Sequence, residues 1–448
     1  MKSDREVPVA IVGGGFSGTI LAAQLARRGI ECLLIDGAGS PGRGVAYSTA
    51  DPAHLLNVPA QGMSAWADDP DHFARRFESE GGDRDGFAER RLFGRYMRDI
   101  AEEAAAGGHM RVLRAFASGA RRDNGGWRVE LDDGSAVRAG LLVLATGNQL
   151  PQQLRPFAEL QNFIADPWGE EARKAVAELA RSGADALLVG TGLTMVDLVL
   201  SLDAAGHGGR IVALSRRGQV PREHSDYESA PISAEELPQP TVRAIMRWLR
   251  RRGAEVGWRA AVDSLRPHSH RLWQGLSHDD QRRFLRHARP WWDVHRHRIA
   301  PQAGATIRRL VAEGRLEVIG GTIVSVTQAE NGLDVRLRRR RQRDAGTMRF
   351  AFAFNCTGPL HAIESTRDPL LRSILDARLA QPGHLGIGLA VDAKSRAGER
   401  LWALGPLTKA RYWEIIAVPD IREQAAQVAD DIAREIQECL RPTSMAIR

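Results

Sequence analysis

The sequence predicts an α/β fold made of two doubly wound modules, with the second module inserted into the first and extended by helices. Two repeated patterns support this prediction. A strand, a glycine-rich turn, a helix and a second strand follow one another at residues 8–36 and again at 185–217. A hairpin followed by an apolar strand that ends in Thr-Gly occurs at residues 127–148 and again at 333–359.

The first unit contains Gly13-x-Gly15-x-x-Gly18 between an apolar strand and an amphipathic helical pattern at 16–29. The glycines permit a tight turn and let a pyrophosphate approach the helix N-terminus. Asp36 ends the next strand, eighteen residues after Gly18, where a carboxylate can accept a hydrogen bond from an adenosine ribose 2′-hydroxyl. In this strand–helix–strand setting the motif predicts a Rossmann-like dinucleotide site.

The second unit contains Gly190-x-Gly192-x-x-Met195. Its first two glycines keep the turn, whereas Met195 replaces the glycine that allows close helix–strand packing, and is expected to push the helix slightly outward. Thr194 adds a hydroxyl near the start of the helix. The next strand leads into Ser215, Arg216 and Arg217, at the position where a site for NAD carries an acid.

A hydroxyl and two guanidiniums bind a 2′-phosphate well, whereas an acid would repel it. The second unit is therefore expected to bind NADPH; the alternative is that Arg216 and Arg217 are surface charge at a strand end. Two dinucleotide sites in one chain indicate electron transfer, with FAD in the first unit and NADPH delivering hydride to its isoalloxazine. This plan is glutathione-reductase-like, but residues 37–66 contain no cysteine, which excludes disulfide reduction by a redox-active pair at that place.

The repeated hairpins set the expected domain boundaries, because each Thr-Gly turn is interpreted as a point where the chain leaves or re-enters the first module. The FAD-binding domain is expected to be discontinuous, at 1–160 and 346–448, with the NAD(P)H-binding domain at 161–345. Within the latter, the strand pattern gives way to helices between about 228 and 300. One of these helices begins with a capping-box-like Ser277-x-x-Asp280.

The stretch from residue 286 to 301 gathers histidines, arginines and two tryptophans. His-x-His at His295 and His297 can bind a metal, but zinc sites need three or four ligands and the flanking arginines oppose a cation. No metal site is therefore expected. The favoured interpretation is a packed cluster near the cofactors, whose basic groups meet an anionic substrate or an NADPH phosphate.

The composition limits partners and location. The chain has 448 residues, 43% hydrophobic and 26% charged, which is typical of a folded protein with room for two domains. Its net charge of +7 is spread along the whole chain, so no nucleic-acid binding is expected. The three cysteines, Cys32, Cys356 and Cys439, lack metal-binding spacing, and there is neither a signal-peptide pattern nor an apolar run of the ~20 residues that span a bilayer. A cytoplasmic protein without membrane association is expected.

Six segments, at 42–66, 90–97, 144–151, 189–197, 355–359 and 404–424, resemble the bacterial FAD–NAD(P)-binding family. That family is related to the class B flavin monooxygenases and N-hydroxylases, among them aspartate N-monooxygenases that make nitrosuccinate. The resemblance implies that Leu56–Ser64 runs beside the flavin and that Gly405–Val418 closes the C-terminal side of the FAD site.

The motifs and the resemblance together define the candidate cofactor contacts, whereas no catalytic residue is assigned. For FAD these contacts are Gly13, Gly15, Ser17, Gly18, Asp36, Asn57, Val58, Met63, Ser64, Thr146, Gly147, Gly358, Gly405, Thr408 and Trp413. For NADPH they are Gly190, Gly192, Thr194, Ser215, Arg216 and Arg217.

The expected function is an NADPH-dependent FAD monooxygenase that acts through a C4a-hydroperoxyflavin, with O₂ and a small polar substrate, such as an amine or amino acid, as partners. The Baeyer–Villiger fingerprint of class B enzymes is absent between Phe157 and Trp168, which disfavours oxidation of ketones to lactones. One alternative is an NADPH:acceptor oxidoreductase without oxygen insertion. Another is a redox-sensing flavin protein without turnover, which the paired motifs disfavour. The sequence leaves the substrate and the oligomeric state open.

Overall fold

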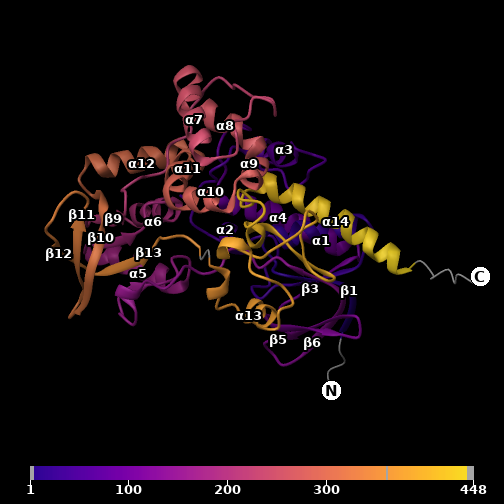
Figure 1. Ribbon diagram of the computed structural model, residues 1–448. Coiled ribbons are helices and arrows are strands. Elements are labelled where there is room, and N and C mark those ends of the chain that lie inside the picture. Colours follow the sequence, from indigo (N-terminus) through magenta and orange to yellow (C-terminus); the bar gives the residue numbers. More distant parts are fainter. Residues whose placement is uncertain (1–4, 360–361, 441–448) are drawn as a thin grey trace, which may run out of the picture. The chain divides into compact units, whose positions relative to one another are not determined.

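The computed structural model describes residues 5–359 and 362–440, and its chain divides into two compact α/β units. Unit 1 consists of Met1–Thr49, Pro59–Gln149 and His361–Arg448, and unit 2 of Ala50–Val58 and Leu150–Leu360. Each unit contains one mixed sheet, so the predicted fold class is confirmed (Figure 1). The expected boundaries of the cofactor-binding domains stay a prediction, because the units are defined by their internal contacts and not by bound cofactors.

The sheet of unit 1 has β1 (Arg5–Val12) at its centre, parallel to β2 (Cys32–Ile35) on one side and to β6 (Ala136–Leu144) on the other. The remaining strands extend it outward from β2 and β6 in the order β14-β15-β6-β1-β2-β3. They are β3 (Met110–Leu113), β14 (Arg396–Gly398) and β15 (Leu401–Ala403), together with the hairpin β4 (Ala117–Asp123) and β5 (Gly126–Leu131), whose second strand pairs with β6. Both faces of β1 are buried, as is usual for a parallel sheet covered on two sides.

Helices cover this sheet. They are α1 (Phe16–Arg27), α2 (Gly44–Tyr47), α3 (His72–Ser79), α4 (Arg90–Ala106), α13 (Pro369–Asp376) and α14 (Val418–Leu440). The long α14, yellow in Figure 1, packs along α1, and α1 also packs against α4. On the other side, α13 packs against β4 and closes a core that contains Trp127 and Leu142. The first and last parts of the sequence therefore build one core.

The sheet of unit 2 has the order β12-β11-β10-β9-β8-β13-β7. Its strands are β7 (Phe163–Ile164), β8 (Ala186–Val189), β9 (Ile211–Ser215), β10 (Leu316–Ala329), β11 (Gly332–Arg339), β12 (Gly346–Phe350) and β13 (Phe352–Asn355). Strands β8 and β9 are parallel, with Val189 opposite Leu214. The helices α5 (Glu170–Ser182), α6 (Leu193–Ala204) and α12 (Pro301–Ala312) belong to this unit.

A helical insert interrupts unit 2 between β9 and α12. It contains α7 (Val242–Val256), α8 (Trp258–Leu265), α9 (Ser269–Gly275), α10 (His278–Arg283) and α11 (Arg289–Arg296). As the capping pattern predicts, the Ser277 hydroxyl accepts a hydrogen bond from the amide of Asp280 at the start of α10. Between α10 and α11 the chain forms a π-helical stretch at Phe284–Ala288.

Asp431 fastens α14 to the sheet of unit 1. Its carboxylate is 1% exposed and accepts hydrogen bonds from Arg396 Nε at 2.7 Å and from Trp402 Nε1 at 3.1 Å, with Lys394 Nζ also at 3.1 Å. Burial by itself raises the pKa of this carboxyl, but the hydrogen bonds from Arg396, Lys394 and Trp402 outweigh it and lower the pKa to about 2. The charged form of Asp431 is therefore the one that holds the helix in place.

Replacing Asp431 with asparagine is expected to lower the free energy of unfolding by about 3 kcal/mol, because Arg396 and Lys394 lose a buried counter-charge. Urea denaturation at pH 7 measures the effect. The matched control is Asp430→Asn on the same helix, since Asp430 is 56% exposed and pairs with Arg28 at the surface. The control is expected to lose less than about 1 kcal/mol; equal losses would contradict a special role for Asp431.

The same carboxyl gives a pH dependence with a defined sign. Because its pKa is lower in the folded protein than its ordinary value of 3.8, its contribution is present above that value and disappears as the pH falls toward 2. The difference in stability between the wild type and Asp431→Asn should therefore shrink between pH 4 and pH 2, as measured by denaturation at each pH.

Candidate functional site

The first glycine turn joins β1 to α1 and depends on contacts that a side chain would prevent. Gly13 has a φ of +110°, and a Cβ there would lie 2.3 Å from the Ala145 carbonyl oxygen. A Cβ on Gly18 would lie 2.0 Å from the Gly13 carbonyl oxygen. Helix α1 starts directly after Gly15, and no side chain caps it. Its first amide groups are therefore available to an anion.

A second glycine element, which the sequence analysis did not assign, lies on the first. The amide of Gly42 donates to the Gly14 carbonyl and to the Thr19 hydroxyl, both at 2.8 Å. A Cβ on Gly44 would lie 3.0 Å from the Gly15 Cα. Arg43 lies between these glycines, and its Nε is buried without a hydrogen-bond partner among the described residues. The spacing Gly42-Arg43-Gly44 shortly after Asp36 was the available signal, and Arg43 is a candidate anion ligand.

Asp36 lies at the end of β2, beside the first turn. One of its oxygens accepts a hydrogen bond from the amide of Ser40 at 2.8 Å. The side chain packs so closely on Gly14 that a Cβ there would lie 2.4 Å from the Asp36 Cγ. The ring of Phe116, 64% exposed, covers the adjacent Gly37. The carboxylate thus lies beside the glycine turn, and its contact with a ribose hydroxyl stays a prediction.

The segment that begins at Gly405 joins the same region of unit 1. Gly405 has a φ of +60°, and a Cβ there would lie 2.6 Å from the Ser17 hydroxyl at the start of α1. The Gly405 amide donates to Gln424 Oε1 at 2.8 Å, and the buried Thr408 hydroxyl donates to the Gly405 carbonyl at 2.8 Å. The structure therefore brings Gly405 and Thr408 to Ser17, whereas Trp413 lies farther along, half-buried before α14.

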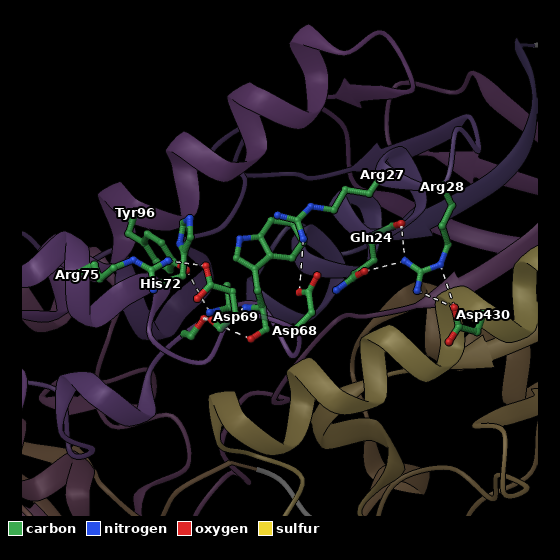
Figure 2. Close-up of polar contacts among 12 residues, drawn as sticks. Gln24, Arg27, Arg28, Asp68, Asp69, His72, Arg75, Tyr96 and Asp430 are labelled. Carbon is green, nitrogen blue, oxygen red and sulfur yellow. Dashed lines mark hydrogen bonds and ion pairs between the residues drawn. The ribbon is translucent and has the colours of Figure 1, made fainter.

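The loop from Met63 to Asp69 is held by a dense set of polar contacts, which Figure 2 shows. The Ser64 hydroxyl donates to the Asp69 carbonyl at 2.5 Å, and the Ser64 carbonyl accepts from Arg422 at 3.0 Å. The Tyr96 hydroxyl accepts from the amide of Ala65 at 3.2 Å. The Ser64 hydroxyl and the Ser64 backbone carbonyl thus both have hydrogen-bond partners within unit 1. A contact of this residue with a flavin remains a prediction.

Two aromatic contacts complete this loop. Trp66 is 3% exposed, and the guanidinium of Arg27 lies 3.2 Å from its ring centroid, while Arg27 also pairs with Asp68 at 3.6 Å (Figure 2). His72 Nδ1 lies 2.9 Å from the Tyr96 hydroxyl. Burial raises the pKa of Tyr96 to about 12 and lowers that of His72, so both groups are neutral near pH 7.

The second glycine turn repeats the first in unit 2. Gly190 has a φ of +123°, and a Cβ there would lie 2.1 Å from the Cys356 carbonyl oxygen. Helix α6 starts after Gly192 without a side-chain cap, as α1 does after Gly15. Met195 is completely buried in the core of unit 2, so the turn forms without a third glycine. The expected outward displacement of α6 stays a prediction.

The end of β9 lies beside this turn. The Ser215 hydroxyl accepts from Thr191 Oγ1 at 2.9 Å and from the amide of Gly218 at 3.0 Å. Arg216 is exposed and Arg217 half-buried, and within the described residues neither makes an ion pair. Sequence reasoning missed Gln219, whose Oε1 is buried without a partner in the described part of the chain. The turn therefore has two open guanidiniums and one buried acceptor beside it.

The expected flavin-lining segment Leu56–Ser64 is divided between the units. Ala50–Val58 belongs to unit 2. It contacts α6 there, because the Ser201 hydroxyl donates a hydrogen bond to the Asp51 carboxylate at 2.7 Å and lies 2.9 Å from His54 Nε2. In the same segment the Asn57 carbonyl accepts from His224 Nε2 at 3.0 Å, and Val58 is half-buried. Burial lowers the pKa of His224 to about 4, so this imidazole is neutral near pH 7.

The Thr-Gly turns follow the equivalent strands of the two sheets. Gly147 comes after β6 with a φ of +72°, and Gly358 comes after β13 with a φ of +85°. A Cβ on either would meet no atom within 4 Å. Thr146 is half-buried and accepts a hydrogen bond from Gln149 Nε2 at 3.4 Å. These turns therefore provide open backbone at the carboxyl ends of their sheets, where ligands of open α/β sheets bind.

Residues 10–149, which carry the first turn, match the family described as FAD-NAD(P)-binding. A curated relative, hydrogen cyanide synthase subunit HcnB of Pseudomonas aeruginosa, is 49% identical over 49 residues, which span only 10% of this chain and 11% of that protein.

Solved structures extend the likeness to the whole fold. DfoA bound to FAD, the cadaverine monooxygenase of Erwinia amylovora, matches with a TM-score of 0.69 at 13% identity, over 96% of this chain and 95% of that one. Ornithine hydroxylase PvdA of Pseudomonas aeruginosa matches with a TM-score of 0.66 at 15% identity, over 96% and 99%. At these identities the likeness shows the fold, which is that of flavoproteins with two dinucleotide-binding domains.

The described residues also bear on metal binding, thiol chemistry and membrane insertion. No group of three or more His, Cys, Asp or Glu side chains there is arranged to hold a metal ion. Cys32 and Cys356 are buried and free, and burial raises the pKa of both thiols, that of Cys32 to about 12. The side chain of Cys439 lies outside the described residues. Over 5–359 and 362–440, no helix has the length and apolar character needed to cross a bilayer.

Gly15→Ala is expected to weaken FAD binding at least about tenfold without unfolding unit 1. Gly15 has a φ of −71°, and its Cβ would lie 3.7 Å from the nearest atom, so the protein itself has room for the methyl group. The methyl group would occupy the space through which a pyrophosphate approaches α1. FAD titration of the apoprotein measures the loss, and circular dichroism checks the fold.

Gly192→Ala is the matched partner of this variant, because its Cβ would meet no atom within 4 Å and its φ is −88°. It should keep FAD and bind NADPH at least about tenfold more weakly. If both variants lost the same cofactor, or neither lost one, the assignment of one dinucleotide to each turn would be wrong.

Proposed function

We propose that this protein is an NADPH-dependent FAD monooxygenase that acts on a small polar substrate. The observation that carries the proposal is the pair of uncapped glycine turns, one in each unit, which differ at the end of the next strand: the first has the acid Asp36 there, and the second has Arg216 and Arg217. Two such turns suit two dinucleotides of different kinds. FAD in unit 1 and NADPH in unit 2 are the pair that this difference favours.

The residues of unit 1 fit FAD. The amides at the start of α1 and the unpartnered Arg43 Nε suit the two phosphates, and Asp36 suits a ribose hydroxyl. The close contact of Gly405 with Ser17 places the C-terminal segment at the same helix end. When bound, FAD supplies the hydride acceptor and the means of activating O₂. The protein's own task is to bind and orient it and to exclude water.

The residues of unit 2 fit NADPH. The amides at the start of α6 suit its pyrophosphate, and Arg216 and Arg217 suit the 2′-phosphate, because guanidinium forks match phosphate oxygens. Ser215 is held in place by Thr191 and by the amide of Gly218, so its hydroxyl oxygen has a fixed position beside the turn. Gln219 Oε1 adds an acceptor for a hydroxyl or amine of the same ligand.

The comparisons favour oxygen insertion over transfer of electrons to a separate acceptor. The structures described as a hydroxylase and a monooxygenase match with TM-scores of 0.66 and 0.69, whereas two thioredoxin reductases and a disulfide reductase match over a similar part of the chain with TM-scores of 0.55, 0.56 and 0.58. Disulfide reduction is disfavoured, because both thiols within the described residues are buried and their pKa values are raised. An NADPH:acceptor oxidoreductase remains the second candidate, since the same two turns would serve its hydride transfer.

The test is turnover with isotopically labelled oxygen. The FAD-loaded protein is expected to oxidise NADPH faster when a substrate from a panel of diamines and amino acids is present, and to transfer one ¹⁸O atom from ¹⁸O₂ to it. Mass spectrometry of the product and NADPH absorbance measure both. NADPH oxidation with hydrogen peroxide but without label in any product would favour the acceptor oxidoreductase. Failure of NADPH to reduce the flavin would contradict both functions.

The double variant Arg216→Ala, Arg217→Ala is expected to lower the preference for NADPH over NADH about 10- to 100-fold in kcat/KM, because two charge-assisted contacts with the 2′-phosphate are lost. Kinetics of flavin reduction with each nucleotide measure this ratio. Arg181→Ala is the control, since Arg181 is exposed in the last turn of α5. An unchanged ratio in the double variant would show that the 2′-phosphate binds elsewhere.

A further inference from the structure

Arg259 lies at the start of α8 in the helical insert, where basic groups outnumber their acidic partners. Its guanidinium covers the ring of Trp258 at 4.4 Å from the centroid, and Arg298 lies 5.2 Å from the same centroid. Arg298 is 3% exposed and is neutralised by Asp263 through two hydrogen bonds, at 3.0 and 2.8 Å. The guanidiniums of Arg259 and Arg298 thus both lie close to the indole of Trp258, but the Asp263 carboxylate neutralises only Arg298.

The acids around Arg259 are already engaged. Asp263 pairs with Arg298 and also accepts a hydrogen bond from Tyr227. The carboxylate of Glu223 pairs with Arg308 of α12. Arg259 donates instead to the neutral Glu223 carbonyl at 3.1 Å, and its Nε is buried without any partner among the described residues.

Two groups respond to the positive charge at this place. Burial lowers the pKa of Arg259, and Arg298 and Arg222 lower it further, with Glu223 offsetting part of this. Burial lowers the pKa of the neighbouring His224 to about 4, and there too Arg298 and Arg296 contribute. A partly desolvated guanidinium without a counter-charge costs free energy, and an anion would remove that cost.

The backbone makes this a fixed arrangement. The amide of Arg222 donates to the Val294 carbonyl at 2.8 Å, and the amide of His224 donates to the Ile299 carbonyl at 3.0 Å. His224 in turn donates to the carbonyl of Asn57, in the segment that the sequence predicts beside the flavin. Arg259 is therefore connected to that segment through Glu223 and His224, all within unit 2.

We propose that Arg259 binds a carboxylate group of the substrate. The identity of the ligand rests on the proposed function, whereas the presence of an anion site does not. A carboxylate is favoured over the NADPH 2′-phosphate, because the second glycine turn already has its own unpaired arginines at Arg216 and Arg217. The guanidinium of Arg259 lies over the ring of Trp258, and a guanidinium carries several N–H donors in one plane, which match the two oxygens of a planar carboxylate.

Binding is measured on the FAD-loaded protein without NADPH, so that the result does not depend on turnover. The probes are succinate, L-aspartate and L-glutamate, with succinamide as the uncharged match and 2′,5′-ADP as the probe of the NADPH phosphate. Isothermal titration should detect at least one of the three carboxylates and not succinamide. Arg259→Gln should lower the affinity for that carboxylate at least about tenfold and leave the affinity for 2′,5′-ADP unchanged.

Three further variants separate the alternatives. Arg250→Gln on α7 is the matched control, since Arg250 is exposed, and should bind as the wild type does. The double variant Arg216→Ala, Arg217→Ala should bind 2′,5′-ADP more weakly than the wild type does and should bind the carboxylate with unchanged affinity. Arg259→Lys keeps the positive charge but loses the planar pair of N–H donors. Its affinity for the carboxylate should therefore lie between those of the wild type and Arg259→Gln.

Thermal unfolding shows whether Arg259 merely supports the fold. Without added anion, Arg259→Gln should melt at or above the wild-type temperature, because a repelled charge has been removed. With the bound carboxylate the wild type should melt higher than the variant. A lower melting temperature of the variant in both conditions would assign Arg259 a structural role and overturn the proposal. So would the absence of binding by all three carboxylates at 10 mM, or a loss of 2′,5′-ADP binding in Arg259→Gln.

Discussion

The close approach of a helix-starting glycine turn to the carbonyl of a neighbouring strand is the constraint on which both units depend. In unit 1 the carbonyl belongs to Ala145 and in unit 2 to Cys356, and in each case a Cβ on the first glycine of the turn would lie within 2.3 Å of it. Because the glycine at that position also has a positive φ, no other residue adopts the conformation without strain. The helix start, its free amides and the open end of the sheet all follow from this one contact.

Three places among the described residues combine a candidate ligand segment with an arginine that has no carboxylate partner. Many arginines of this basic chain pair with acids, as Arg298 does with Asp263 and Arg396 with Asp431. The guanidiniums at Arg43, at Arg216 and Arg217, and at Arg259 have no such carboxylate partner among the described residues. Each group lies beside a segment that sequence or geometry associates with a ligand. A guanidinium left without a carboxylate in a partly buried place is a functional candidate because the fold gains nothing from leaving it so.

The polar loop after Met63 illustrates a different use of buried groups. Here the hydroxyls of Ser64 and Tyr96 and the ring of Trp66 are satisfied by neighbours in the same unit, so the loop is held in one conformation. Such a loop can form a stiff wall for a planar ring, but its side-chain donors are not free to recognise it. Recognition in this stretch would therefore rely on shape and apolar contact, and the specific polar contacts would come from the glycine turns.

The sequence by itself determined the local elements, because their causes are local. The strand–turn–helix units, the glycines of both turns, the Ser277 cap and the basic residues after β9 follow from periodicity, spacing and residue chemistry over a few positions. Only the tertiary structure decided which distant residues meet. Gly405 packs against Ser17, Arg43 lies at the first turn, and Ala50–Val58 contacts α6, whereas Arg259 has no acidic partner among the described residues. Each of these outcomes depends on packing between segments that are far apart in the chain. Side-chain pairing of this kind is set by the three-dimensional arrangement of all nearby charges, which no window of the sequence contains.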